Sequence, residues 1–322
     1  MRALVLSALS LLLVAACGPV ERGTYVATGQ YRVYEAASRQ NSQQLAVIDS
    51  GSLKTVRTLP IGTPSPDWKH LYSVASNTLI DSNPETGDTL HTLALGRSYE
   101  LPLVTISGVP GGLSQNGRWL VLDTLDTAGK NPPKASHFLV VDTSYKSPPV
   151  AIDLTGWFVF DGVSNDGRFV YLLEYLSNSN YRVRMYIVNE HLLNPAVIVD
   201  KSEPQASMSG VRVASVSPDG QWQYTVYARE HNGAFIHALP LDGAPFAICI
   251  DLPGAGFAKD AGAFRWSLAV NPRGTVLYAV NGAIGNVTEI NIEGDSGPKI
   301  TRSVHIDSTR TAVHALIQDV EA

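Results

Sequence analysis

Cysteine, charge and membrane-length hydrophobic runs are all scarce in this chain. Only two cysteines are present, Cys17 and Cys249, so the sequence offers no framework of disulfides. Charged residues make up 16% of the chain, and the net charge is −5 without any basic block, which argues against a nucleic-acid partner. Hydrophobic residues make up 44%, which indicates a folded chain rather than a disordered one.

The one apolar segment that approaches membrane length lies at the N-terminus. Arg2 is followed by an uncharged apolar run over residues 3–14, and Ala15 and Ala16 precede Cys17. This pattern is typical of a secretory signal with its cleavage site. A run of about a dozen residues, at ~1.5 Å per residue in a helix, is too short to cross ~30 Å of hydrocarbon.

The end of this segment, residues 14–17, resembles the bacterial lipobox. The resemblance implies cleavage before Cys17, acylation of its thiol and attachment to the cell membrane or outer membrane on the extracytoplasmic side. Residues 1–16 are then the signal peptide, and 17–23 the lipidated N-terminus with a short linker. An unlipidated signal peptide and an uncleaved anchor are the alternatives. Acylation leaves Cys249 without an intrachain partner, and its apolar neighbours predict a thiol in a core strand.

One motif recurs through residues 24–322, which we interpret as a single domain. Its five copies start 49, 50, 53 and 54 residues apart, a fixed period that indicates a repeat architecture; they occupy residues 65–72, 114–121, 164–171, 217–224 and 271–278. Asn-Gly and Asp-Gly pairs in the copies supply the positive φ angles of a tight turn. Trp68 stands where the other copies have Gly, so the first turn is expected to differ.

Each turn is flanked by one strand-like run before it and three after it. Bulky residues such as Trp222 and Tyr224 follow the turn at a spacing of two, which places them on one face of a strand. Helical periodicity is nearly absent. The paired runs that complete the units lie at residues 45–49 and 54–59, 78–81 and 89–93, 138–142 and 150–154, 184–188 and 196–199, 234–239 and 246–250, and 287–292 and 301–306.

Four-stranded antiparallel units of this length, repeated five or more times, are the blades of a β-propeller. The sequence therefore predicts an all-β fold, a propeller of six blades. The sixth blade is expected to combine N-terminal strands with a strand at residues 311–317, so that strands from both termini close the ring. Seven blades are the alternative, if residues 24–27 and 303–306 form a separate blade.

Two local patterns resemble known propeller repeats. Ser-Pro-Asp-Gly before an aromatic strand, at residues 217–222, looks like the WD40-like repeats of TolB-type propellers, and residues 45–62 resemble the YVTN repeat of extracytoplasmic propellers. The match covers residues 31–317 as a pattern, and the TolB resemblance implies protein partners in the cell envelope. Propellers host scaffolds, binding proteins and enzymes alike, and the matched positions form turns and core, so no functional residue is carried over.

Motifs for catalysis are weak. Ser164 lies in Gly-Val-Ser-Asn-Asp, which lacks the last glycine of a nucleophile elbow. The eight histidines are scattered, with no helical i, i+4 pair of the kind that binds zinc. Lactonase-type propellers hold a divalent cation in the channel through acidic and amide side chains, and by that resemblance Asp161, Glu174 and Asp260 are the candidate ligands here.

Recognition is expected on one face of the propeller. With the strands of each blade named a to d, the d–a and b–c connections emerge on the same side. These connections are the long ones in this chain, and loops on a rigid scaffold carry recognition. The candidate contacts are Lys130, Lys134, Tyr181, Arg229, His231, Asn232 and Lys259.

These features favour a lipid-anchored binding or scaffold protein of the cell envelope. It is expected to be a monomer that needs no cofactor, with a protein or small-molecule ligand on the loop side. A metal-dependent lactonase or hydrolase with its site in the propeller channel is the alternative.

Overall fold

A computed structural model describes residues 32–39, 42–106, 108, 110–124, 132–200, 207–229, 233–253, 261–294 and 297–305. In this part of the chain the secondary structure comprises 23 strands and two short 3-10 segments, with no α-helix, as predicted. None of its helical segments has the length and apolar character of a membrane span. The signal segment, Cys17 and the predicted closing strand at residues 311–317 lie outside the described residues.

The described strands form six sheets that follow one another along the chain. The first sheet contains β1 (Arg32–Arg39), β2 (Ser42–Asp49) and β3 (Thr55–Pro60). The second contains β4 (Thr63–Pro64), β5 (Leu71–Ala75), β6 (Thr78–Ser82) and β7 (Thr89–Ala94). The third contains β8 (Trp119–Asp123), β9 (Ala135–Asp142) and β10 (Val150–Thr155).

The later sheets repeat this order. The fourth contains β11 (Trp157–Val163), β12 (Phe169–Ser177), β13 (Asn180–Ile187) and β14 (Leu192–Leu193). The fifth contains β16 (Val211–Val216), β17 (Trp222–Arg229), β18 (Gly233–Pro240) and β19 (Phe246–Leu252), with β15 (Val199–Asp200) added parallel to β19. The sixth contains β20 (Ser267–Val270), β21 (Val276–Asn281), β22 (Asn286–Asn291) and β23 (Lys299–His305).

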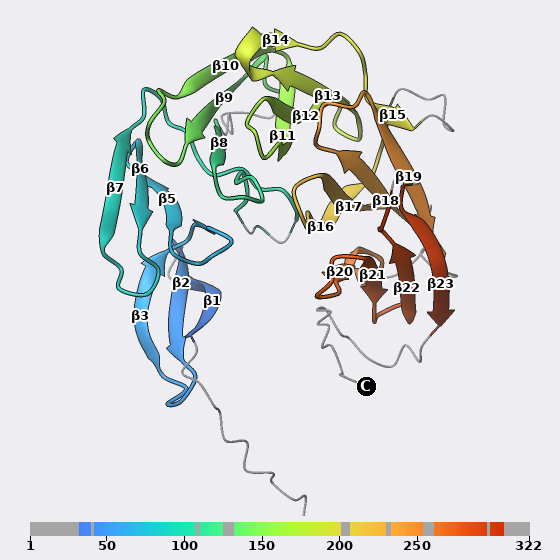
Figure 1. The fold of residues 1–322 in the computed structure, drawn as a ribbon, viewed down its shortest axis with the longest axis horizontal. Coiled ribbons are helices and arrows are strands. Elements are labelled where there is room, and N and C mark those ends of the chain that lie inside the picture. Colours follow the sequence, from blue (N-terminus) through green and yellow to red (C-terminus); the bar gives the residue numbers. More distant parts are fainter. Residues whose placement is uncertain are drawn as a thin grey trace, which may run out of the picture.

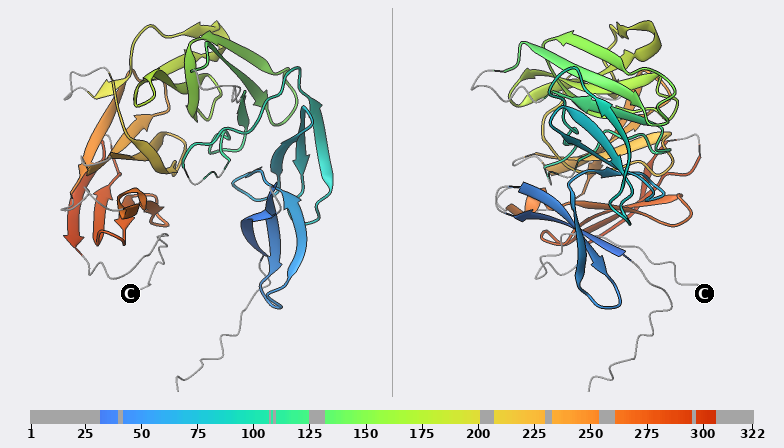
Figure 2. Two further views of the ribbon diagram at one scale, coloured as in Figure 1. Left: turned by 180° about the vertical axis from the view of Figure 1, so that it is seen from behind. Right: turned by 90° about the vertical axis from the view of Figure 1, so that its left-hand side faces the viewer.

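The sheets stand side by side along an arc, with early strands of each sheet toward the centre and later strands toward the rim (Figures 1 and 2). This is the arrangement of blades in a β-propeller. The first and last sheets flank the open side of the arc (Figure 1). Within the described residues no strand of the first sheet pairs with one of the last, so closure of the ring by both termini and the number of blades stay predictions.

One predicted outer strand is wrong. Residues 196–199 were expected to complete the fourth sheet, but β14 pairs with β13 instead, and Ile198 forms only an isolated bridge with Val183. The cause lies at Asn194, whose side-chain Oδ1 accepts a hydrogen bond from the backbone N–H of Ala196 at 2.9 Å. This turn sends the chain to the edge of the fifth sheet, where β15 pairs with β19.

The repeat motif forms the tight turn that the sequence predicts. In the second copy the N–H of Ser114 donates to the carbonyl of Trp119 at 2.8 Å, and Gly117 has a φ of 74°. The expectation that the first copy differs is wrong: Trp68 takes the same left-handed conformation, with a φ of 55°. Its indole ring stacks on Tyr34 of the first sheet at 4.3 Å between centroids, a contact that offsets the backbone strain.

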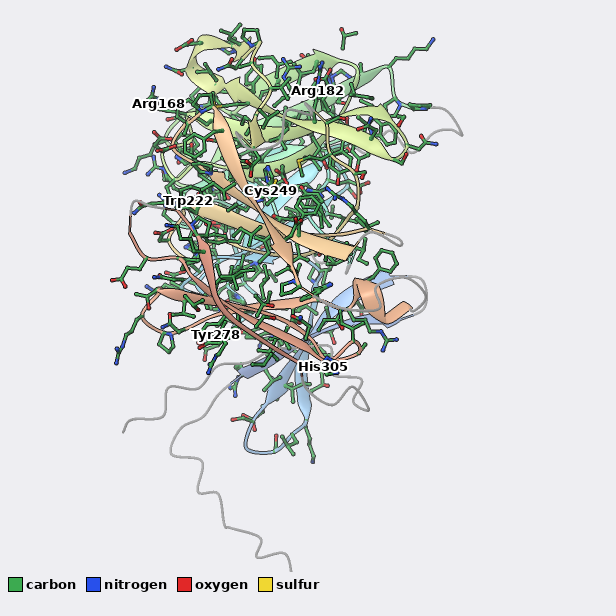
Figure 3. All side chains as sticks on the ribbon, turned by 90° about the vertical axis from the view of Figure 1, so that its right-hand side faces the viewer. Arg168, Arg182, Trp222, Cys249, Tyr278 and His305 are labelled. Atoms are coloured by element: carbon green, nitrogen blue, oxygen red, sulfur yellow. The ribbon has the colours of Figure 1, made fainter. Side chains whose placement is uncertain are left out.

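Neighbouring repeat turns are joined by hydrogen bonds at one end of the strands. Asn116 donates from its backbone N–H and its Nδ2 to Asn165, and Asn165 Nδ2 donates to the carbonyl of Asp219 at 3.0 Å. Arg168 and Trp222 mark this end of the molecule in Figure 3, and Arg182 lies toward the other end. We call the first end the turn face and the second the loop face.

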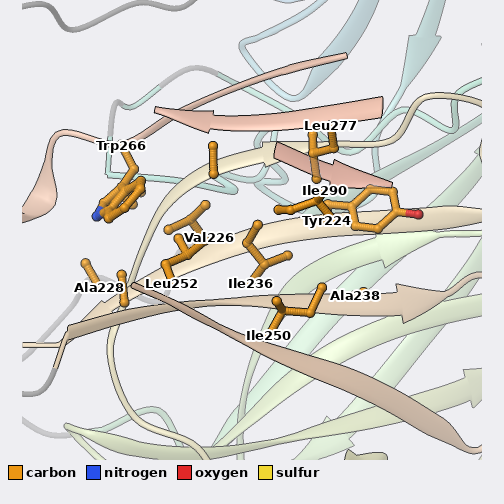
Figure 4. Close-up of a cluster of buried hydrophobic side chains, with 13 residues drawn as sticks. Tyr224, Val226, Ala228, Ile236, Ala238, Ile250, Leu252, Trp266, Leu277 and Ile290 are labelled. Atoms are coloured by element: carbon orange, nitrogen blue, oxygen red, sulfur yellow. The ribbon is translucent and has the colours of Figure 1, made fainter. Parts of the chain in front are cut away.

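Apolar side chains fill the space between successive sheets. Figure 4 shows the cluster between the fifth and sixth sheets, where Val226, Ile236 and Ile250 meet Leu277 and Ile290. Cys249 packs against a similar cluster between the fourth and fifth sheets, and it forms no disulfide within the described residues. Burial of both faces of each inner sheet explains why the repeated strands are so uniformly apolar.

Candidate functional site

Three of the seven predicted contact residues fall in the described part of the chain. Lys134 is exposed just before β9, and Arg229 ends β17. Tyr181 does not lie on a loop: it is the second residue of β13 and only 2% exposed. The other four lie outside the described residues, as does the lipidation candidate Cys17; these four are Lys130, His231, Asn232 and Lys259.

A cavity of about 550 Å³ opens at the loop face. Its walls come from the connections around residues 103–106, 178–181, 209–212 and 228–229, together with Tyr175 and Phe264. Segments that precede the third, fifth and sixth sheets, together with the b–c connections of the fourth and fifth sheets, therefore share one hollow, which we call the loop-face cavity. It contains Tyr181 and Arg229 but not Lys134.

Two tyrosines that line the loop-face cavity, Tyr175 and Tyr181, belong to a row of aromatic rings that continues into the interior. Tyr175 stacks on Trp157 at 4.3 Å and lies 5.2 Å from Tyr181, whose ring is 5.9 Å from that of Tyr227. Tyr227 in turn stacks on Phe235 at 5.3 Å. The row follows from strand register, because Trp157 faces Tyr175, Tyr175 faces Tyr181, and Tyr227 faces Phe235 across neighbouring strands.

The two inner tyrosines of this row differ in their hydrogen bonding. The hydroxyl of Tyr181 donates to the carbonyl of Gly210 at 2.8 Å, whereas the buried hydroxyl of Tyr227 has no partner among the described residues. Burial raises the pKa of both phenols far above the ordinary value. Both phenols are therefore neutral, and only Tyr181 lines the cavity.

Arg229 is held in place at one wall of the loop-face cavity. Its guanidinium carbon lies 4.2 Å from the ring centroid of Phe235, and its Nε donates to the carbonyl of Ser209 at 3.3 Å. A cation stacked on an aromatic ring in a partly buried site is favourable and restricts the side chain. Arg229 therefore presents its charge in a fixed direction.

A second arginine, Arg212 of β16, connects three parts of the chain beneath the cavity. Its Nη1 donates to the carbonyl of Phe160 at 2.8 Å and lies 3.4 Å from Asp161 Oδ1, and its Nη2 lies 3.4 Å from the carbonyl of Leu103. The backbone of Arg212 accepts a hydrogen bond from the N–H of Ile106 at 3.0 Å. These hydrogen bonds hold the segment 103–106 against β16.

The two acidic candidates in the described part of the chain, Asp161 and Glu174, are each engaged by arginine. Asp161 is 1% exposed; burial raises its pKa, and the charge of Arg212 opposes that rise without cancelling it. Glu174 accepts two hydrogen bonds from Arg182, at 2.7 and 3.0 Å, and a third from Arg184. The part of the chain that the structure describes contains no group of three or more His, Cys, Asp or Glu arranged to hold a metal ion. Asp260 lies outside the described residues.

A second cavity, of about 510 Å³, lies nearer the axis of the arc. Asp161 and Gln223 line it, and Gln223 Nε2 donates to the backbone carbonyl of Asp161 at 2.8 Å. Val104 and Thr105 line both cavities, so the segment 103–106 forms a partition between them.

A further buried carboxylate, Asp123 at the end of β8, lies close to this region. Its backbone exchanges two hydrogen bonds with Glu100, at 2.7 and 3.0 Å, but its Oδ1 has no partner among the described residues. The pKa of Asp123 is raised to about 7, first by burial and then by the charge of Glu100, and the charge of Arg212 opposes the rise.

Sequence reasoning missed Arg212 and the segment 103–106. Arg212 is the one charged residue of β16, in an otherwise apolar and small strand (Val-Arg-Val-Ala-Ser-Val). A single arginine in such a strand needs buried hydrogen-bond partners, so the strand sequence alone could have indicated that Arg212 joins separate parts of the fold.

Comparisons with known proteins add a likeness of fold only. No protein-family model matches the sequence, and no curated protein matches it. Among solved structures, hydrazine synthase of Kuenenia stuttgartiensis is 14% identical with a TM-score of 0.49, over 77% of this chain and 70% of that one. Hsv2 of Kluyveromyces marxianus is 10% identical with a TM-score of 0.49, over 85% and 83%. TolB of Acinetobacter baumannii is 11% identical with a TM-score of 0.43, over 85% and 66%.

Proposed function

We propose that this protein is a binding protein of the cell envelope, anchored by lipid on Cys17, that holds its ligand in the loop-face cavity. The observation that carries the proposal is the convergence of segments from several sheets on one hollow that is lined by Tyr175, Tyr181 and Phe264 and by the fixed Arg229. Its volume of about 550 Å³ lies in the range of small-molecule sites, about 300–1,000 Å³. The arginine pairing of Asp161 and Glu174 favours binding over metal-dependent hydrolysis.

The scaffold in this proposal is a closed propeller of six blades. Ser303 and His305 belong to β23, which pairs with β22, and this placement favours six blades over the seven that need residues 303–306 in a separate blade. The first sheet has three strands, with β1 at one edge. A strand from residues 311–317 beside β1 completes a four-stranded blade and closes the ring.

Filling the cavity tests the binding role. Ser179 is an exposed lining residue, so Ser179→Trp is expected to block the mouth of the cavity without loss of fold. The matched control is Ser147→Trp, an exposed serine in the β9–β10 connection at the turn face. The probes are two fluorescent naphthylamines, anionic anilinonaphthalene sulfonate and neutral N-phenylnaphthylamine. We expect Ser179→Trp to weaken both at least tenfold; equal binding by both variants rejects the cavity as the binding site.

The anchor has its own test. Cys17→Ser is expected to move the protein from the membrane fraction to the soluble fraction, because acyl chains supply the affinity of such anchors. Cys249→Ser is the matched control, since its thiol packs in the interior, and it is expected to stay with the membrane. Retention of the Cys17→Ser variant in washed membranes contradicts the lipid anchor.

A further inference from the structure

The loop-face cavity carries positive charge without a matching negative charge. Two of the described residues that line it are arginines, Arg212 and Arg229, and none is Asp or Glu. The charge of Arg212 is partly balanced by Asp161 at 3.4 Å. Arg229 has no carboxylate partner among the described residues; its two contacts are the ring of Phe235 and a backbone carbonyl. Among the described residues, the unbalanced charge of the cavity is therefore that of Arg229.

The geometry of Arg229 leaves hydrogen-bond donors for a ligand. Its Nε is used by Ser209, and one face of the guanidinium lies over Phe235. No described residue accepts a hydrogen bond from its two Nη atoms. A planar guanidinium with two donors in a fixed orientation fits a carboxylate, sulfonate or phosphate oxygen pair.

The remaining walls contain both polar and apolar residues, and several of the apolar ones are partly open to solvent. Leu103, Ile106 and Val211 are 45%, 59% and 38% exposed at the cavity. Tyr175 and Phe264 add aromatic surface. Exposed apolar groups gathered at one hollow mark a ligand site more often than chance.

We infer that the loop-face cavity binds an amphipathic anion: a small molecule with one anionic group, held by Arg229, and an aliphatic or aromatic body against Tyr175 and the apolar rim. This inference rests on the proposed binding function and adds the chemical class of the ligand. A neutral ligand of the same shape gains the apolar contacts but leaves the Arg229 donors unpaired. Hydrogen bonds from charged donors change affinity by roughly 10- to 100-fold.

The experiment compares the two naphthylamine probes on the purified protein and its variants. We expect Arg229→Gln to weaken anilinonaphthalene sulfonate at least tenfold and N-phenylnaphthylamine less than threefold. Arg229→Lys is expected to recover part of the loss, because it keeps the charge. Arg273→Gln is the matched control, since Arg273 is an exposed arginine in the last repeat turn. Thermal unfolding of each variant checks that the fold is kept.

The outcomes separate this inference from the proposed function. If Ser179→Trp weakens both probes but Arg229→Gln leaves the anionic probe unchanged, the ligand class is wrong and the binding site stands. If Arg229→Gln weakens both probes equally, Arg229 acts through the shape of the cavity, and the inference is again overturned. If Ser179→Trp affects neither probe, the proposed function fails and the inference fails with it.

Discussion

Asp123→Asn is expected to stabilise the protein at pH 8, and to stabilise it by a clearly smaller amount at pH 5. The carboxyl has a pKa of about 7 in the folded protein against an ordinary 3.8. The two values correspond to a ratio of about 1,000 in proton affinity, and each factor of ten is worth about 1.4 kcal/mol. The folded state therefore favours the neutral carboxyl by at most about 4 kcal/mol.

The sign of the pH dependence follows from which state holds the proton. Between about pH 4 and pH 7 the folded protein keeps the proton of Asp123 and the unfolded chain has released it. The free energy of unfolding then falls as the pH rises through this window, and it levels off above it. Asparagine is neutral throughout, so the variant escapes this loss.

Urea unfolding of the wild-type protein, Asp123→Asn and the control Asp88→Asn at pH 5 and pH 8 measures the effect. Asp88 is an exposed carboxylate in the second sheet, so its variant is expected to follow the wild type. All histidines are common to the three proteins, so their contribution cancels in the comparison. The reasoning is refuted if Asp123→Asn loses as much free energy of unfolding between the two pH values as the wild type does.

Three further predictions concern packing and pairing. Gly167 and Gly274 share a φ of 71°, but an added Cβ meets an indole ring, at 2.4 Å, only at Gly167. Gly167→Ala is therefore expected to cost about 1–3 kcal/mol more than Gly274→Ala and to have the lower melting temperature. Equal melting temperatures of the two variants contradict the close contact. Tyr227→Phe is expected to be neutral or stabilising in urea unfolding, whereas Tyr181→Phe costs about 1 kcal/mol because only its hydroxyl is bonded; the reverse order rejects this account. Glu174→Ala leaves two arginines unpaired, one of them 9% exposed, and is expected to cost about 3 kcal/mol; a cost below about 1 kcal/mol shows that solvent replaces the pair.

Local turn chemistry made the fold predictable, and contacts from distant sheets produced the errors. Asn-Gly and Asp-Gly pairs specify a left-handed residue from sequence alone, and the structure has one in each of these turns. Trp68 adopts the same conformation in contact with Tyr34, which comes from another sheet, so its own turn sequence does not predict it. The misplaced strand at residues 196–199 has a local cause at Asn194 that strand periodicity does not register.

The site was predictable in outline and not in its chemistry. Connection lengths alone identify the side of the sheets where loops gather, and the loop-face cavity lies there. The contacts of Arg212 join residues 52 and 109 positions apart in sequence, which no spacing rule anticipates. The sequence places Tyr181 directly after a short connection and so predicts a loop contact, whereas pairing with Tyr175 buries Tyr181 in the sheet.

The contacts of Arg212 also bear on how the molecule opens. In a row of repeats each unit touches only its neighbours, so the units at the ends are expected to unfold first and independently. Arg212 ties the fifth sheet to the fourth through Phe160 and to the segment before the third through Leu103. The third, fourth and fifth sheets are therefore expected to open as one cooperative unit. Amide hydrogen exchange is expected to give these three sheets a common opening free energy, above that of the sheets at either end of the arc.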